Sequence, residues 1–145
     1  MSCCYFPWTQ HYWLRVKLVL NAAQAVCTDT IHRVRFLDGV NGETVTAAYL
    51  NSLTFAFAEV TGRSYGGGVL TFEPSEAERL PLPLTNAKKL NLLQFDQLLR
   101  ANDIETVLDI TDRILLQDGL GLSNRQIKML RGIWVKLRDR RINRR

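Results

Sequence analysis

The spacing of hydrophobic positions changes along the first third of the chain. Apolar and polar residues alternate over residues 15–20, and this period of two predicts a strand that ends at Asn21. A second strand is expected over residues 30–36, where apolar residues are mixed with histidine and arginine. Residues 1–13 are rich in aromatic residues and cysteine but have no period, so they predict no element.

Residues 43–60 have helical spacing instead. Their apolar side chains recur at steps of three and four residues, which predicts one amphipathic helix with Gly62 as a left-handed terminus. A loop is expected over residues 63–68, followed by a short strand over residues 69–72.

Capping residues divide the rest of the chain into helices. Pro74 suits the first turn of a short helix in which Ser75 and Glu78 have capping-box spacing. One helix is predicted over residues 90–100, and the next follows the cap Asn102-Asp103 and continues to Gly119. The final helix follows a capping box of Ser123 and Gln126, and we expect its buried stripe to contain Ile127, Leu130, Ile133 or Trp134, and Leu137.

These elements predict an α+β fold. Residues 15–86 form a small mixed α/β portion, residues 87–145 form an all-helical tail with a basic final helix, and residues 1–14 are a poorly specified N-terminal segment. A length of 145 residues with 46% hydrophobic residues is typical of one ordinary globular domain. The chain has no signal-peptide pattern and no apolar run of the roughly 18–20 residues that a membrane helix needs, so we expect a cytoplasmic protein without membrane contact.

Positive charge is concentrated at the end of the chain. The net charge is +5, but residues 125–145 carry nine of the nineteen Lys and Arg residues against one acid, Asp139. This stretch therefore has a net charge of +8, and the first 124 residues have a net charge of −3. The asymmetry indicates an anionic partner, nucleic acid first, while a solvated basic helix face explains it equally well.

Three successive glycines form the most conspicuous motif. Gly66, Gly67 and Gly68 follow Arg63 and Tyr65, and backbone N–H groups in such a run can approach a phosphate closely. The run is not a nucleotide-binding loop, because a helix is predicted before it and a strand after it. A tight helix-to-strand connection and a phosphate-facing loop both remain open.

Other polar groups point to no enzymatic chemistry of their own. The acids Glu73, Glu76 and Glu78 stand at a predicted helix start, where they favour the positive end of the helix dipole and are more typical of caps than of paired catalytic carboxylates. The two histidines and three cysteines lack metal or redox spacing, and no local motif resembles a nucleophile elbow. We therefore predict no catalytic, cofactor-binding or metal-ligating residue.

Three stretches carry a resemblance to a known family. They are residues 26–36 (VCTDTIHRVRF), the run from Leu50 through the triglycine motif to Leu80-Pro81-Leu82-Pro83, and residues 134–141 (WVKLRDRR). In this order they resemble the carboxy-terminal part of bacterial adenine-specific (N-6) DNA methyltransferases of restriction-modification systems.

The resemblance implies a target-recognition region, which grips double-stranded DNA and helps to choose the sequence that is methylated. Enzymes of this family transfer a methyl group from S-adenosylmethionine with a Pro-Pro motif and an upstream glycine-rich loop, and neither occurs in this sequence. We therefore expect a DNA-binding fragment or subunit without activity alone and without a cofactor in this chain. The alternatives are a protein-interaction module that docks on a separate methyltransferase catalytic subunit through the apolar stripes of its two final helices, and an inert truncated remnant.

The expected DNA contacts fall into three groups. In order, they are Arg63 and Tyr65 with Gly66, Gly67 and Gly68, then His32, Arg33 and Arg35, then Arg138, Arg140 and Arg141.

Overall fold

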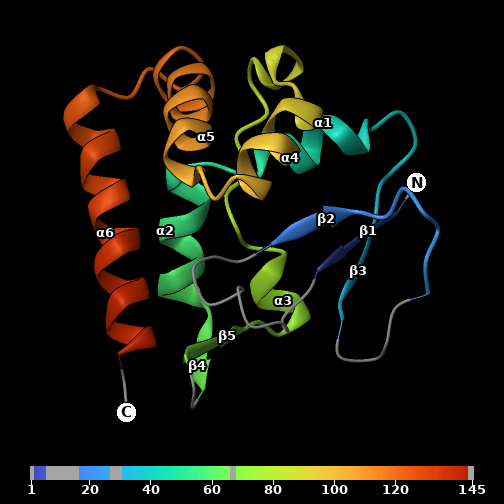
Figure 1. Ribbon diagram of the computed structural model, residues 1–145, viewed down its shortest axis with the longest axis horizontal. Coiled ribbons are helices and arrows are strands. Elements are labelled where there is room, and N and C mark those ends of the chain that lie inside the picture. Colours follow the sequence, from blue (N-terminus) through green and yellow to red (C-terminus); the bar gives the residue numbers. More distant parts are fainter. Residues whose placement is uncertain (1, 6–16, 27–30, 66–67, 144–145) are drawn as a thin grey trace.

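The structure is a computed structural model that describes residues 2–5, 17–26, 31–65 and 68–143 (Figure 1). Two small antiparallel sheets lie beside a group of helices, which confirms the α+β class predicted from the hydrophobic pattern. No helix in these ranges combines the length and the apolar character needed to cross a membrane.

The larger sheet has three antiparallel strands in the order β2-β1-β3. The outer strands, β2 (Leu18–Leu20) and β3 (Arg33–Arg35), lie within the two strands predicted from the sequence and are shorter. The central strand, β1 (Ser2–Tyr5), was missed, because its residues do not alternate between apolar and polar. All three residues of the edge strand β3 are exposed.

The single helix expected in the first half is wrong, because the chain forms two. Helix α1 (Gly42–Ala48) and helix α2 (Ser52–Thr61) are separated at Asn51. The Asn51 side chain accepts a hydrogen bond from the Thr54 amide and donates one to the Ala48 carbonyl. Asparagine favours such caps over continued helix, so it ends one helix and begins the next although the apolar spacing runs through it.

A hairpin replaces most of the predicted loop. Strand β4 (Arg63–Tyr65) follows α2 directly and pairs antiparallel with β5 (Val69–Thr71). Gly62 is extended (φ −71°, ψ 158°) rather than left-handed. A Cβ atom at Gly62 would lie 2.7 Å from the Leu70 side chain, so close packing and not a positive φ explains this glycine.

The predicted helix starts after the hairpin are mostly confirmed. Helix α3 (Pro74–Ala77) has proline in its first turn, although its capping box joins Glu73 and Glu76 rather than Ser75 and Glu78. The caps at Asp103 and Ser123 are present. The remaining elements are the 3-10 turn η3 (Ala87–Lys89), α4 (Leu92–Arg100), α5 (Ile104–Thr111), the π-helical stretch η4 (Asp112–Gln117) that continues α5, and α6 (Asn124–Ile142).

Helix α6 packs along α2 and completes the core (Figure 1). The Phe55 ring of α2 and the Trp134 ring of α6 are 5.2 Å apart between centroids, and each residue is 1% exposed. Trp134 therefore occupies the buried position that the spacing left open, while Ile133 faces outward at 37% exposure. Apolar residues from both halves of the chain share this core.

Candidate nucleic-acid interface

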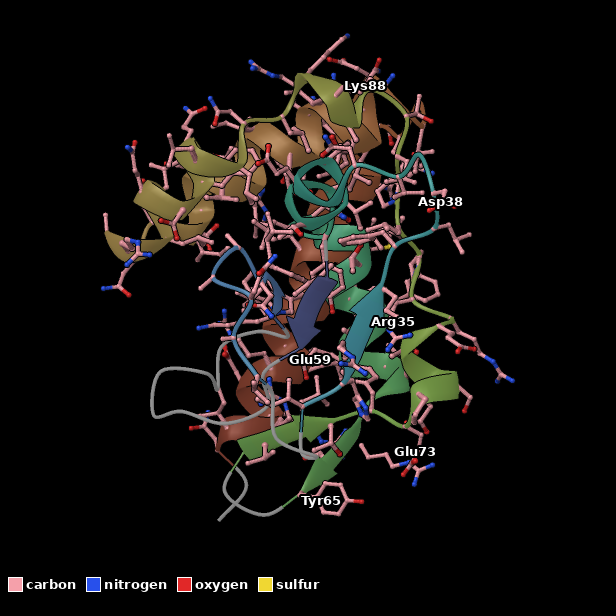
Figure 2. The ribbon with its side chains drawn as sticks, turned by 90° about the vertical axis from the view of Figure 1, so that its right-hand side faces the viewer. Arg35, Asp38, Glu59, Tyr65, Glu73 and Lys88 are labelled. Carbon is pink, nitrogen blue, oxygen red and sulfur yellow. The ribbon has the colours of Figure 1, made fainter. Side chains whose placement is uncertain are left out.

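The hairpin β4–β5 lies beside the C-terminal end of α6 (Figure 1). We call this region, made of β4, β5 and the last two turns of α6, the hairpin end. Figure 2 shows Tyr65 there, with Glu73 nearby and Lys88 at the opposite end of the molecule. Residues from all three expected groups of DNA contacts meet at or beside the hairpin end.

Two hydrogen bonds to backbone carbonyls join these groups. An Nη1 hydrogen of Arg141 in α6 is donated to the Gly68 carbonyl, immediately before β5. His32 Nε2, which precedes β3, donates to the Phe72 carbonyl immediately after β5, at 2.9 Å. The tertiary structure therefore connects segments that are 40 and 73 residues apart in the sequence.

Within the hairpin, Tyr65 and Arg63 differ in what they can offer a ligand. Tyr65 is 56% exposed. The Arg63 guanidinium lies 3.0 Å from Glu76 and 3.3 Å from Glu73, and the hydrogen bond with Glu76 raises the pKa of Arg63. A phosphate at Arg63 must therefore compete with two carboxylates. Gly66 and Gly67 lie outside the described residues, and Gly68 is buried.

Arg33 and Arg35 are the most accessible of the expected contacts on the larger sheet. Both are exposed on edge strand β3, and neither forms an ion pair with any residue that the structure describes. In Figure 2, Arg35 lies closer to the middle of the molecule than Tyr65 does. Exposed arginines on an edge strand also discourage pairing with another chain, so these charges have a structural explanation as well.

Arg141 departs from its expected role as a surface contact. The residue is 5% exposed, and its guanidinium makes a bidentate ion pair with Glu59 of α2, at 2.9 Å from Nε and 2.6 Å from Nη2. Its Nη1 donates to the Gly68 carbonyl, so all three nitrogens of the guanidinium donate hydrogen bonds within the protein. The reason is helical periodicity, because Arg141 follows Trp134 by seven residues and so lies on the same buried face.

The other two arginines near the end of α6 are less buried. The Arg138 guanidinium lies 4.8 Å from the centre of the Trp134 ring and forms an ion pair with Asp139. Arg140 is exposed and has no ion pair among the described residues. Of the three arginines expected at this end, Arg140 is thus the one whose charge is uncompensated and accessible.

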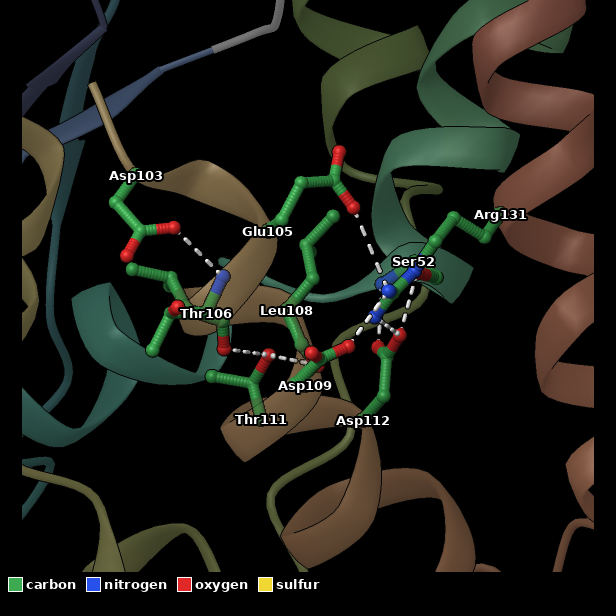
Figure 3. Close-up of polar contacts among 10 residues, drawn as sticks. Ser52, Asp103, Glu105, Thr106, Leu108, Asp109, Thr111, Asp112 and Arg131 are labelled. Carbon is green, nitrogen blue, oxygen red and sulfur yellow. Dashed lines mark hydrogen bonds and ion pairs between the residues drawn. The ribbon is translucent and has the colours of Figure 1, made fainter.

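Sequence reasoning missed a second arginine cluster, centred on Arg131 (Figure 3). The Arg131 guanidinium lies 2.9 Å from Asp112, 2.7 Å from Asp109 and 3.5 Å from Glu105. Burial lowers the pKa of Arg131, but the hydrogen bonds that its guanidinium donates to Asp109 and Asp112 outweigh burial, so the pKa is raised. The three acids are four and three residues apart, and this helical spacing is the signal that could have revealed them.

The buried member of this cluster also caps α2. Asp112 accepts hydrogen bonds from the backbone N–H of Ser52 at 2.8 Å and from its hydroxyl at 2.6 Å. A carboxylate at a helix N-terminus is favoured by the helix dipole. The cluster therefore braces α2, α5 and α6 against one another. No group of three His, Cys, Asp or Glu side chains in the described part of the chain is placed to hold a metal ion.

This framework of helices and hairpin leaves several arginines and lysines exposed without an ion pair in the part of the chain that the structure describes. The family model for the C-terminal domain of the type II methyltransferase M.Eco57I matches residues 9–116, which is well over half of the chain. The chain belongs to this family of methyltransferase C-terminal domains. No curated protein and no solved structure matches it. Helix α6 lies beyond the matched residues.

Proposed function

We propose that this chain is the target-recognition region of an adenine-specific DNA methyltransferase, that it binds double-stranded DNA, and that it has no catalytic activity alone. Membership of the M.Eco57I C-terminal domain family is the observation that carries the proposal. It is supported by the exposed cations and aromatic ring around the hairpin end, because most protein–DNA hydrogen bonds go to phosphates and fix the register of the protein on the duplex.

Within this proposal, the contact residues have different weights. Arg33, Arg35, Tyr65 and Arg140 are exposed, so they are the contacts we favour. Arg63 contributes if DNA displaces its carboxylate partners, and Arg141 acts through the fold. An arginine bidentate to guanine contributes about 1–3 kcal/mol of discrimination, whereas an arginine on a phosphate changes the salt dependence without changing specificity.

The test is binding of the purified chain to random duplex DNA over a series of salt concentrations, with thermal unfolding measured in parallel. We expect a cooperative unfolding transition and a logarithm of affinity that falls linearly with the logarithm of salt concentration. The variant Arg33→Gln/Arg35→Gln should lower the slope by about two if both residues bind phosphates.

Lys88→Gln/Lys89→Gln is the matched control. It also removes two exposed positive charges, but Lys88 lies at the end of the molecule opposite Tyr65 (Figure 2). Equal effects of the two pairs would indicate general charge attraction rather than a located interface. A folded wild-type chain without salt-dependent affinity for duplex DNA would refute the proposal.

A separate methyltransferase catalytic subunit is the second candidate partner. Val107, Leu108, Ile127 and Trp134 of the apolar stripes on the two final helices lie in the core, so these stripes offer little surface for docking. A groove between β2, α1 and α4 remains, with a volume of about 1100 Å³ and several leucines in its lining. Leu93 lines it and is 68% exposed, so Leu93→Glu should abolish co-purification with a catalytic subunit and leave DNA affinity unchanged if the groove is used for docking.

A further inference from the structure

The outward face of α6 carries charges that the fold does not use. The three arginines on or beside the buried face, Arg131, Arg138 and Arg141, all have carboxylate partners. The remaining cations of α6 are exposed and form no ion pair with any residue described by the structure: Arg125, Lys128, Lys136 and Arg140. The cations of α6 without a carboxylate partner are therefore available to bind an external anion.

These outward cations form one surface. At 100° per residue, they fall within about a third of the helix circumference, opposite Trp134. From Arg125 to Arg140 the stripe is about 22 Å long at about 1.5 Å per residue. The one acid on this face, Asp139, is paired with Arg138.

Gly132 lies near the middle of the same stripe. It is exposed in the interior of a helix, where glycine costs about 0.5–1 kcal/mol relative to alanine. A Cβ atom at Gly132 would have no neighbour within 4 Å, so packing inside this domain does not explain the glycine. It leaves a flat position, between cations on either side, at which another backbone can approach the helix closely.

We propose that the outward face of α6 lies against the sugar-phosphate backbone of duplex DNA, with its cations on phosphates and Gly132 at the point of closest approach. This inference rests on the proposed function and places the duplex on a helix outside the residues matched to the family. Of the contacts favoured above it includes Arg140, whereas β3 with Arg33 and Arg35 lies on the opposite side of the molecule from α6 (Figure 1) and contacts a different stretch of DNA. Duplex DNA carries one negative charge per about 1.7 Å of axis, so a stripe of this length faces many phosphates. An anionic membrane fits less well, because the exposed Met129 lies among the cations and Ile133 borders them, so the helix presents no separate exposed apolar face.

The first test is the variant Lys128→Gln/Lys136→Gln, with Lys88→Gln/Lys89→Gln as its control of equal charge and residue type. Binding of the full chain to a random duplex is measured over a salt series. The α6 pair should lower the salt slope by about two, and the control pair should leave it unchanged. An unchanged slope for the α6 pair, or equal losses for both pairs, would overturn the inference.

The second test separates close approach from folding. Gly132→Ala should raise the melting temperature by a few degrees, because alanine is the better helix former. The same substitution should weaken DNA binding several-fold, and Gly132→Gln should weaken it further. A more stable variant with weaker binding is not explained by a structural role, whereas unchanged affinity in both variants would overturn the inference.

The two proposals fail in different ways. If the folded wild-type chain has no salt-dependent DNA affinity, the proposed function fails and this inference fails with it. If the wild type binds and the substitutions on α6 have no effect, the inference alone is wrong. Vesicles of phosphatidylcholine and phosphatidylserine serve as the alternative ligand, and losing vesicle binding while keeping DNA binding in the α6 variants would also overturn it.

Discussion

Two arginines on α6 form ion pairs with different neighbours, Arg141 with α2 and Arg131 with the stretch that forms α5 and η4. Arg141 is almost completely buried, with a side chain 4% exposed, and it meets one carboxylate, Glu59, whose side chain is 3% exposed. Arg131 has a side chain 24% exposed and meets three carboxylates, of which Asp112 alone is buried. The difference predicts that loss of the one carboxylate at the buried Arg141 costs more stability than loss of one of three carboxylates at the more exposed Arg131.

Together the two arginines set the register of α6 on α2. Arg131 reaches Asp112 beside Ser52 at the start of α2, Trp134 packs on Phe55, and Arg141 pairs with Glu59 near its end. The helices therefore run in the same direction, with contacts about every one to two turns. Arg141 also donates a hydrogen bond to the Gly68 carbonyl, so the residue that positions α6 on α2 also attaches the hairpin to α6.

The largest expected effect is at the buried pair. Glu59→Gln leaves the guanidinium of Arg141 buried without a counter-charge, and we expect a loss of about 3–5 kcal/mol in the free energy of unfolding, measured by urea denaturation. The double variant Glu59→Leu/Arg141→Met removes both charges and should be more stable than Glu59→Gln alone. If the free energy of unfolding of Glu59→Gln were within about 1 kcal/mol of the wild-type value, Arg141 would not depend on Glu59 more than an exposed arginine depends on its partner.

A smaller loss is expected at the buried acid of the other cluster. Asp112→Asn weakens the hydrogen bonds to Ser52 and Arg131, but Arg131 keeps Asp109 and Glu105 as partners. We expect the free energy of unfolding to fall by about 1.5–3 kcal/mol, the range for hydrogen bonds to charged groups. A cost equal to or above that of Glu59→Gln would show that the extra carboxylates do not share the charge of Arg131.

Almost no effect is expected at the outermost acid. Glu105 lies 3.5 Å from Arg131 and its side chain is 61% exposed, so Glu105→Gln should change the free energy of unfolding by less than about 0.5 kcal/mol. High salt should erase this difference but leave the cost of Glu59→Gln largely intact, because buried pairs are screened much less. If the loss of unfolding free energy in Glu105→Gln did not depend on salt, Glu105 would not behave as the exposed partner that the structure shows.

The smallest effect concerns the exposed ion pair on the hairpin, as a function of pH. The hydrogen bond from the Glu73 backbone, together with Arg63, holds the pKa of Glu76 below its ordinary value of 4.5. A lowered pKa means that the carboxylate stabilises the hairpin at neutral pH and that this contribution is lost as the pH falls through the folded-state value. We expect amide hydrogen exchange in β4 and β5 to accelerate below about pH 4 in the wild type relative to Glu76→Gln. Glu78→Gln, which alters a neighbouring exposed acid, should behave as the wild type does.

Local signals in the sequence were sufficient for much of this fold. The alternation around Leu18 predicts β2, the cap at Ser123 predicts the start of α6, and Pro74 predicts the first turn of α3. These predictions hold because each depends on the conformational preference of a few neighbouring residues. The same reasoning failed at Asn51, where a capping side chain overrides an apolar spacing that continues through it.

The sequence alone is enough to predict the α+β class, the basic end of the chain and a set of candidate contacts around the hairpin. Which of the basic residues are accessible depends on tertiary contacts, because ion pairs form across as many as 82 residues, as between Glu59 and Arg141. Sequence spacing fixes the side of α6 on which an arginine lies, but the carboxylates that meet it come from α2 and from the stretch that forms α5 and η4. For that reason Arg141 becomes part of the core while Arg140, its neighbour in the chain, remains free to meet an external anion.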